Sequence, residues 1–339
     1  MGKHYSVGLI MPIMTSYTPR ELFEASLESI TETAASSFNQ FKLVIVHSVW
    51  SSTDPGYEPG YNVKELAESI SDFVGIDYIE CEAKGAAYAR NLGLQRCDTE
   101  LVGFIDADDL MIPGGVDRLI YDAHSLHCDP RHALMIGGGE TNSDAPDWVK
   151  GYLDSTRGMA IDTSSAIIKG SDVMRPGLKS FLQRYIIGAD LLNEHRDLLF
   201  DSSLVYGEDL DWAIKAGAAA ALSMAPVIVS EAMMFKYIMG HDTSVMACKP
   251  KWFPLVQLGT VETIKAGSFM QRVRDNNAVV YDYDYVLGRL SEMVVNTAEA
   301  DSTFEVDECG YSFNIMNLMC EHYKRIVETE RKKFTRAQL

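Results

Sequence analysis

A cluster of four residues in the first half of the chain contains three carboxylates, which suit a site that binds a cation. The four are Asp106-Ala107-Asp108-Asp109, and they directly follow the apolar run Leu101–Ile105. Carboxylates held this close repel one another unless something neutralises them. A Mg²⁺ or Mn²⁺ ion, bound by one or two carboxylates and by substrate phosphates, supplies that neutralisation. A solvated turn that caps the next helix uses the same residue types, so the cluster alone leaves both interpretations open.

A second acidic group opens a segment with helical character. Glu208 and Asp209 follow Gly207 and stand just before Trp212. A carboxylate in such a position can accept a proton from a hydroxyl group as a general base. It can also do no more than favour the amino end of a helix, with Asp209 as the N-cap and Glu208 in the first turn. For this group taken alone, the capping interpretation is the simpler one.

Two other segments carry groups that suit phosphate or metal. Gly85 and the small residues after it permit a ligand to approach the backbone closely, and Arg90 has the planar fork that matches a phosphate group. An ordinary surface arginine on a tightly packed helix is the alternative. His241 lies in a polar loop, where a lone histidine is more often structural than ligating.

The elements that must position these residues alternate between strand and helix. Apolar runs predict four strands, at Val7–Met11, Phe41–Val46, Ile76–Cys81 and Leu101–Ile105, and the first of these ends at Pro12. Helical spacing predicts helices between them, at Arg20–Ala35, Asn62–Phe73 and Gly85–Leu94. The alternation indicates βαβ units and a largely parallel sheet. Because ligands of such sheets bind at the carboxyl ends of the strands, chemistry is expected directly after Ile105.

The second half of the chain is less regular. Leu134–Ile136 and Ser165–Ile168 read as further strands, and Leu204–Ala221 contains a helix. Beyond about residue 246 long helical patterns with few strand signals predominate.

The composition narrows the class of protein. The 339 residues are 47% hydrophobic and 23% charged, a globular balance that excludes general disorder. The chain has 48 acidic and 30 basic residues, and the formal net charge of −18 disfavours a protein that holds nucleic acid by neutralising its phosphates. The six cysteines are scattered, and neither a membrane-spanning run nor a signal peptide is present, which favours a cytoplasmic protein with reduced thiols.

Taken together, the motifs resemble those of the family 2-type glycosyltransferases. The family pattern has an apolar strand that runs into a proline, an "ARN-x-G" helix, an "hhDADD" element followed by a proline, and a "GEDxD" element. This chain has them in that order as Val7–Pro12, Ala89–Gly93, Gly103–Pro113 and Gly207–Asp211. The resemblance covers about residues 4–245 and is most specific in the ARN and DADD pair.

The resemblance implies a fold and a domain organisation. We expect an α/β fold of the GT-A type over residues 1–245, with a Rossmann-like, mostly parallel central sheet flanked by helices. Residues 246–339 are expected to form a helical C-terminal extension, which offers a surface for homo-oligomers. The basic stretch Lys324 to Arg336 within it fits best as a solvated terminal helix, and contact with an anionic membrane surface or an anionic partner is the alternative.

The resemblance also assigns roles to individual residues. Asp106 is expected beside the nucleotide ribose, Asp108 on the metal ion that bridges the diphosphate, and Asp209 as general base with Glu208 to position it. The nucleotide-sugar site is expected to comprise Pro12, Met14, Arg90, Asp106 and Ala107. The expected metal ligands, for Mn²⁺ or Mg²⁺, are Asp108, Asp106 and His241.

The implied activity is metal-dependent, inverting transfer of a sugar from a nucleotide-diphosphate sugar to an acceptor hydroxyl. The acceptor class is open: a glycan, a lipid-linked sugar or another hydroxyl, with nucleic acid disfavoured by the charge. A retaining GT-A transferase, a nucleotidyltransferase or a non-catalytic module that binds nucleotide sugar or glycan are the alternatives.

One departure from the family pattern bears on the donor. At the end of the second strand the family usually has an acidic pair, whose first Asp often contacts the nucleobase. This chain has His47-Ser48 there, and only Ser52-Thr53-Asp54 survives of the pattern. The UDP-sugar that the family favours therefore lacks support at this position. Trp50 is available to stack on a base or to pack as an ordinary tryptophan.

Overall fold

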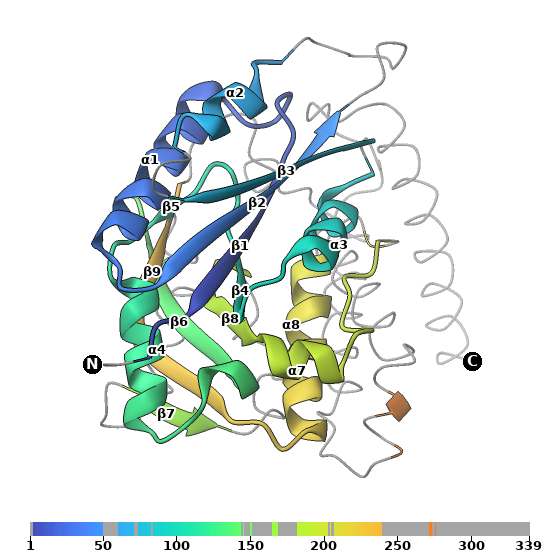
Figure 1. Cartoon of the computed structure of the whole chain (residues 1–339). Coiled ribbons are helices and arrows are strands. Elements are labelled where there is room, and N and C mark those ends of the chain that lie inside the picture. Colours follow the sequence, from blue (N-terminus) through green and yellow to red (C-terminus); the bar gives the residue numbers. More distant parts are fainter. Residues whose placement is uncertain are drawn as a thin grey trace, which may run out of the picture.

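The chain folds as a twisted mixed sheet with helices on both faces (Figure 1). The computed structural model describes residues 3–49, 60–70, 74–82, 84–143, 145, 150, 165–168, 182–202, 204, 207–238, 271–272 and 275. Almost all of the expected C-terminal extension at 246–339, as well as Trp50 and His241, therefore lies outside the described residues. No helix within the described ranges is long and apolar enough to span a membrane.

The first half is the repeated strand–helix unit that the sequence predicts. Its strands are β1 (Ser6–Ile13), β2 (Gln40–Val49), β3 (Gly75–Glu82) and β4 (Leu101–Phe104). Its helices are α1 (Arg20–Ser36), α2 (Val63–Glu68) and α3 (Ala86–Arg96). The strands pair in parallel in the order β3-β2-β1-β4. The expected strands and helices are all present, with α2 shorter than predicted.

The prediction that the first strand ends at Pro12 is wrong. Pairing of β1 with β2 continues through Pro12 to Ile13, which lies opposite His47. Pairing with β4 on the other side stops at Ile10 and Phe104. Beyond that point β1 has a neighbouring strand on one side only, and proline is tolerated in a strand where its missing N–H group faces no partner.

The second half adds shorter elements that make the sheet mixed. They are β5 (Leu110–Met111), α4 (Gly115–Ser125), β6 (Leu134–Thr141), β7 (Ser165–Ile168), β8 (Tyr185–Gly188), α7 (Ala189–Glu194), α8 (Glu208–Leu222) and β9 (Val227–Tyr237). The sheet continues β4-β8-β6-β9-β5, with β7 beside β9. Because β8 is antiparallel to both β4 and β6, the sheet is parallel in its first half and mixed in its second.

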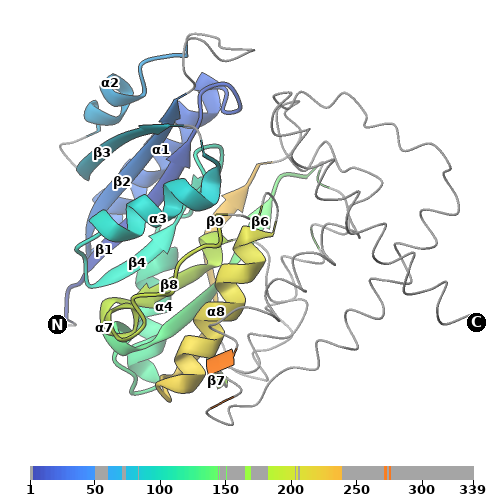
Figure 2. The same cartoon turned by 90° about the vertical axis from the view of Figure 1, so that its right-hand side faces the viewer.

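Two apolar cores lie on the two faces of the sheet, and Figure 2 shows from the side the helices that pack on the sheet. One core packs α3, α7 and α8 against the sheet around the fully buried Trp212. The Trp212 ring lies 4.9 Å from that of Phe104 and 5.6 Å from that of Phe200. The other core packs α1 and α4 against the opposite face. The helices that carry Arg90 and Asp209 therefore share one face and one core.

Close packing of α3 on β1 is made possible by a glycine. A Cβ atom built on Gly93 lies only 2.3 Å from Cγ2 of the buried Ile10. Glycine therefore lets the helix approach the sheet more closely than any other residue would. This contact sets the height of α3, and so of its polar residues, above the sheet.

Gly93→Ala should destabilise the fold by about 1–2 kcal/mol, because overpacking against Ile10 outweighs the better helix propensity of alanine. The measurement is the urea concentration at half-unfolding. Gly75→Ala is the matched control, since its Cβ would have no neighbour closer than 3.7 Å. Equal midpoints for the two variants would contradict this account of the contact.

Candidate active site

The acidic cluster lies at the carboxyl edge of the sheet. Asp106 to Asp109 follow β4 in a tight turn, in which the Asp109 amide donates to the Asp106 carbonyl at 3.1 Å. The next element is the strand β5, and α4 begins only at Gly115. The cluster therefore does not cap a helix, and that interpretation of it is wrong. Asp106 and Asp108 are half-buried, whereas Ala107 and Asp109 are buried.

The end of β1 lies at the same edge as the cluster. Strands β1 and β4 are parallel neighbours, so their carboxyl ends meet at the same edge of the sheet. Pro12 and Met14, which the family resemblance assigns to the nucleotide sugar, are half-buried at this end of β1. The Met14 carbonyl accepts hydrogen bonds at 3.0 Å from the amides of Tyr17 and Thr18, which turn the chain toward α1.

Arg90 joins the two acidic groups that the sequence singles out. Its Nη2 donates to Asp106 Oδ1 and its Nη1 to Glu208 Oε1, both at 2.8 Å. Arg90 is only 5% exposed, so the interpretation as a surface arginine is wrong. Burial disfavours the charged guanidinium, but the charges of Asp106 and Glu208 outweigh it and raise the pKa of Arg90. The phosphate contact expected for Arg90 stays a prediction.

Glu208 and Asp209 are the first two residues of α8. The N-cap is Gly207, in a left-handed conformation at φ 76°, and no side chain caps this end. The interpretation of Asp209 as an N-cap is therefore wrong. Asp209 is instead a much weaker acid than usual. Burial, and next the charge of Glu208, raise its pKa to about 7. A carboxylate with such a pKa is suited to accept a proton near neutral pH.

A network around Asn91 and Asp211 fixes the approach of the chain to α8. Asn91 forms a reciprocal pair with the backbone of Phe200: its amide donates to the carbonyl at 2.9 Å and its oxygen accepts from the N–H at 2.8 Å. The buried Asp211 accepts from Lys215 at 2.6 Å and from the Asp201 amide at 3.2 Å. Phe200 and Asp201, which precede α8 in the chain, are thus held by contacts from α3 and α8.

Gln183 also contacts the acidic cluster, although no sequence motif marks this residue. It lies in the short helix η2 (Leu182–Arg184), and its Nε2 donates to Asp106 Oδ2 at 2.8 Å and to Asp109 Oδ2 at 2.6 Å. Asp109 also accepts from the Ile238 amide at 3.0 Å. Burial, and next the charges of Asp108 and Asp106, raise the pKa of Asp109 well above its usual range. A lone glutamine forms no motif, so only its register with β4 could have indicated it.

The donor atoms at this edge fit a divalent cation that substrate phosphates help to bind. Asp106 and Asp108 offer the hard oxygen ligands that Mg²⁺ and Mn²⁺ prefer. The Tyr61 hydroxyl donates to the Thr18 carbonyl at 3.1 Å, and burial, then the charge of Asp108, raise the pKa of this hydroxyl. Within the described residues no group of three or more potential ligand side chains assembles. Two carboxylates therefore suit an ion whose coordination a bound diphosphate completes.

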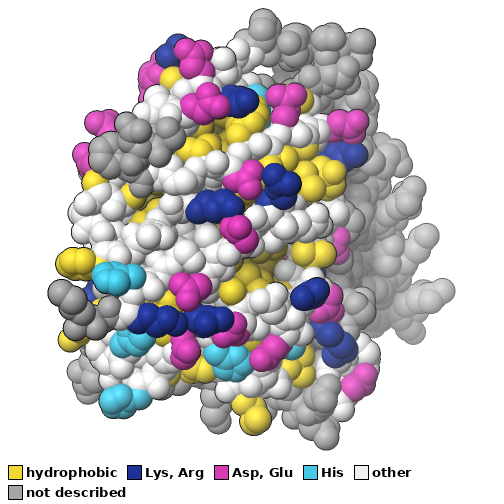
Figure 3. Space-filling model, viewed as in Figure 1, with side chains coloured by type: hydrophobic (Ala, Val, Ile, Leu, Met, Phe, Trp, Pro, Cys, Tyr) yellow, Lys and Arg dark blue, Asp and Glu magenta, His cyan; other side chains and the backbone are white. Residues whose placement is uncertain are grey.

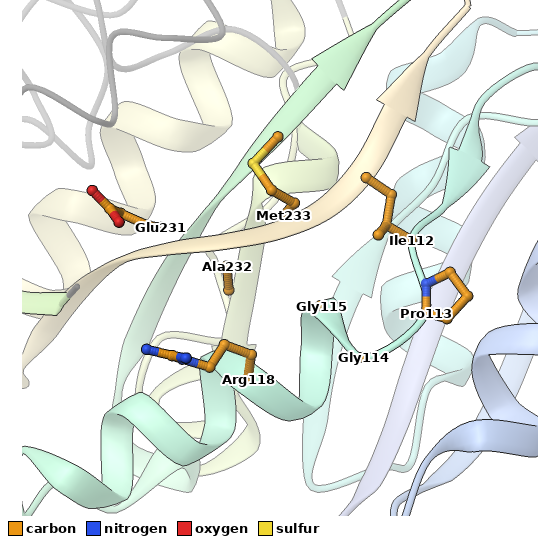
Figure 4. Close-up of a pocket in the computed structure, with 8 residues that line it drawn as sticks. All are labelled: Ile112, Pro113, Gly114, Gly115, Arg118, Glu231, Ala232 and Met233. Atoms are coloured by element: carbon orange, nitrogen blue, oxygen red, sulfur yellow. The ribbon is translucent and has the colours of Figure 1, made fainter.

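Two cavities lined by described residues lie away from this cluster. One, of about 360 Å³, is an open hollow between the start of α4 and the middle of β9, with Arg118 and Glu231 as its charged lining side chains (Figure 4). The other, of about 600 Å³, surrounds Thr99 and Glu100 before the amino end of β4. Neither cavity is lined by the acidic residues that the sequence singles out.

The surplus of acidic residues does not produce one field of negative charge on the face drawn in Figure 3, where acidic and basic side chains are interspersed. Among the ion pairs of the described residues, Lys42 pairs with both Asp77 and Asp98. The net charge therefore says less about function than the position of a few carboxylates.

Comparison with known proteins decides the family. Residues 13–129 match the family model described as glycosyl transferase family 2. This segment belongs to a family 2 glycosyltransferase domain. The matched segment includes the Arg90 helix and the acidic cluster, and it ends before Gln183, Glu208 and Asp209. The chain has no match among curated protein sequences.

Solved structures share the fold of this glycosyltransferase. A fragment of TarS from S. aureus in complex with UDP has a TM-score of 0.51 and 14% identity, over 88% of this chain and 72% of the fragment. The same fragment in complex with UDP-GlcNAc gives 0.51 and 14%, over 87% and 73%. The mannosyltransferase PcManGT from Pyrobaculum calidifontis, in complex with GDP-Man and Mn²⁺, gives 0.51 and 14%, over 97% and 84%. At this identity the likeness establishes the GT-A fold.

Arg90→Met should destabilise the glycosyltransferase by about 3–5 kcal/mol, because it removes the cation between two carboxylates at a buried position. The measurement is denaturant unfolding at neutral pH. Arg96→Met on the same helix is the control, since Arg96 is 62% exposed on its side chain and reaches Asp77 at only 3.4 Å. Its cost should stay below about 1 kcal/mol. A similar cost for both variants would rule out a special role for the Arg90 bridge in stability.

Proposed function

We propose that the protein is a metal-dependent, inverting glycosyltransferase that moves a sugar from a nucleotide-diphosphate sugar to an acceptor hydroxyl. The observation that carries the proposal is the Arg90 bridge, which joins Asp106 of the donor cluster to Glu208 beside Asp209. A transferase that inverts needs a leaving-group site and a base near each other on opposite sides of the anomeric carbon. The bridge supports such a pairing.

Asp209 is the general base in this proposal. The acceptor hydroxyl must lose its proton as it attacks the anomeric carbon, and the Asp209 carboxylate accepts that proton. Its pKa of about 7 gives it much more proton affinity than an ordinary Asp. Glu208 and Asp209 both lie in the first turn of α8. The ion pair of Glu208 with Arg90 therefore holds the base in position as well.

Asp106 and Asp108 serve the donor. Asp108 would hold a Mn²⁺ or Mg²⁺ ion, with Asp106 and His241 as the further expected ligands, and the ion would stabilise the charge of the departing nucleoside diphosphate as a Lewis acid. His241 is three positions after Ile238, the residue whose amide binds Asp109. Asp106 orients the ribose, and Pro12, Met14, Arg90 and Ala107 complete the nucleotide-sugar site.

The donor is a nucleoside-diphosphate sugar whose base we leave open between UDP and GDP, the nucleotides in the complexes of the structural neighbours. The acidic pair that the family places after the second strand is His47-Ser48 in this chain. His47 bonds the Tyr78 hydroxyl at 2.7 Å through Nδ1. The acceptor we propose is the hydroxyl of a glycan or lipid-linked sugar.

We assign the transferase domain to residues 1–245 and a helical extension to residues 246–339, with the extension as the surface for any homo-oligomer. A cytoplasmic enzyme, free or at the surface of a membrane, is the location we propose. The thiols of Cys81, Cys97 and Cys128, which are free in the structure, suit a reducing compartment.

Two variants separate the donor role from the base role. Asp108→Ala should lose both transfer and Mn²⁺-dependent binding of UDP or GDP, because the proposed metal ligand is gone. Asp209→Asn should lower kcat by at least about 100-fold, the contribution of a general base, while nucleotide binding persists. Calorimetry measures binding, and NMR of the product gives its anomeric configuration.

Asp98→Asn is the matched control for these variants. Its side chain is 78% exposed and lies before the amino end of β4, so turnover should be unchanged. Near-normal turnover of Asp209→Asn would remove Asp209 as the base. Retention of the donor's anomeric configuration in the product would overturn the inverting mechanism.

The pH dependence follows from the raised pKa of Asp209. Below about pH 7 the proposed base is protonated, so kcat/KM should fall about tenfold for each further unit of pH. The same shift acts on stability, because the folded-state pKa lies above the ordinary value of 3.8. The charged carboxylate therefore costs stability above pH 7, and the cost vanishes below about pH 4.

Asp209→Asn should accordingly raise Tm at pH 8 and leave it unchanged at pH 4, while Asp98→Asn gives no such gain at pH 8. Thermal unfolding of the two variants and the wild type across this range measures the difference. A Tm gain that grew as the pH fell would contradict the assigned sign.

A further inference from the structure

Topology brings Gln183 to the acidic cluster. Strand β8 is antiparallel to β4, with Leu101 opposite Gly188 and Gly103 opposite Ile186. Continuing this register past the end of β4 sets Gln183 opposite Asp106. Gln183 lies just before the start of β8, and β8 and β1 flank β4 on opposite sides. The residue thus reaches the cluster from the side of β4 that faces away from β1.

The Gln183 amide uses both of its hydrogens on carboxylates. Nε2 donates to Asp106 at 2.8 Å and to Asp109 at 2.6 Å, and the residue is only 3% exposed. Its Oε1 is buried and accepts no hydrogen bond within the described part of the chain. A buried amide carbonyl without a partner is unfavourable. The reversed orientation would bring that carbonyl against two carboxylates, so the donating orientation is the one that the site requires.

Gln183 also completes the fixation of Asp106. One oxygen of this carboxylate accepts from Arg90 on α3, and the other accepts from Gln183 on η2. Two donors from different elements fix the plane of a carboxylate whose side chain remains 35% exposed. Asp106 is therefore rigid and still accessible.

The donor at position 183 is neutral, and this has a consequence for cation binding. A lysine or arginine there would make the same hydrogen bonds but would cancel one negative charge of the cluster. An amide orients the carboxylates while their summed charge remains available to attract a divalent cation. Gln183 thus orients the carboxylates of Asp106 and Asp109 without reducing the negative charge of the cluster.

We propose that Gln183 is a positioning residue of the donor site. Its hydrogen bonds to Asp106 and Asp109 hold Asp106 in place for the nucleotide sugar and leave the negative charge of the acidic cluster unneutralised. This inference rests on the proposed function, since it presupposes that the cluster binds a cation and a nucleoside diphosphate. The residue itself acts through the two aspartates.

Two variants test the two parts of the proposal. Gln183→Met keeps the size and flexibility of the side chain but removes both donors, and the affinity for UDP or GDP with Mn²⁺ should fall at least tenfold. Gln183→Lys keeps a donor and adds a positive charge, so the affinity for Mn²⁺ alone should fall further than in Gln183→Met. Calorimetry measures nucleotide binding, and electron paramagnetic resonance measures free Mn²⁺.

The controls make each outcome decisive. Gln95→Met, at an exposed position on α3, should bind Mn²⁺ and nucleotide as the wild type does. Thermal unfolding establishes that the variants fold; should Gln183→Met fail to fold, Gln183→Asn replaces it, because its shortened amide cannot reach both aspartates. A folded variant with an affinity within twofold of wild type would overturn the positioning role. Equal Mn²⁺ affinities of Gln183→Lys and Gln183→Met would overturn the charge argument.

The test also separates this inference from the function on which it rests. Wild-type protein that binds Mn²⁺ with UDP or GDP, together with an unaffected Gln183→Met, removes only the role of Gln183. Wild-type protein that binds neither nucleotide in the presence of Mn²⁺ contradicts the proposed function itself.

Discussion

The whole site depends on one buried cation placed between two carboxylates. Arg90 contacts Asp106 and Glu208 at 2.8 Å each, and these acids come from chain segments about a hundred residues apart. Removing charges from water is costly unless partners compensate, and Arg90 supplies one cationic partner to both acids. The guanidinium therefore makes one site of two acidic groups that would otherwise repel each other.

The fold around Arg90 serves to hold that cation in position. Gly85, at φ 90°, turns the chain into α3 in a conformation that other residues adopt at a cost, and Gly93 seats the helix on β1. Asn91 ties the neighbouring position to Phe200, over whose ring the Arg90 guanidinium lies at 5.6 Å. The place of the Arg90 side chain at the site is thus determined by separate features of α3: its start at Gly85, its packing on β1 at Gly93 and its tie to Phe200 through Asn91.

The sequence predicted the first half of the fold well because its strands and helices alternate with clear punctuation. It also found both acidic groups, since one follows a predicted strand and the other opens a predicted helix. It missed β8 and β9, whose pairing with distant strands is decided by tertiary contacts. Gln183 was missed for the same reason: its importance comes from its place opposite Asp106. Arg90 was found as a residue, but its ion pairs were not, because pairing with Asp106 and with the distant Glu208 is decided by tertiary contacts and leaves no local pattern.

The shared guanidinium also constrains how this protein can diverge. A change at Asp106 or at Glu208 leaves half of a buried cation without its partner, and a change at Arg90 leaves two acids without theirs. Each single step away from the present arrangement is therefore unfavourable, although a concerted replacement of all three need not be. Among descendants of this sequence the three positions should be inherited as a unit, while the surrounding surface charges drift freely.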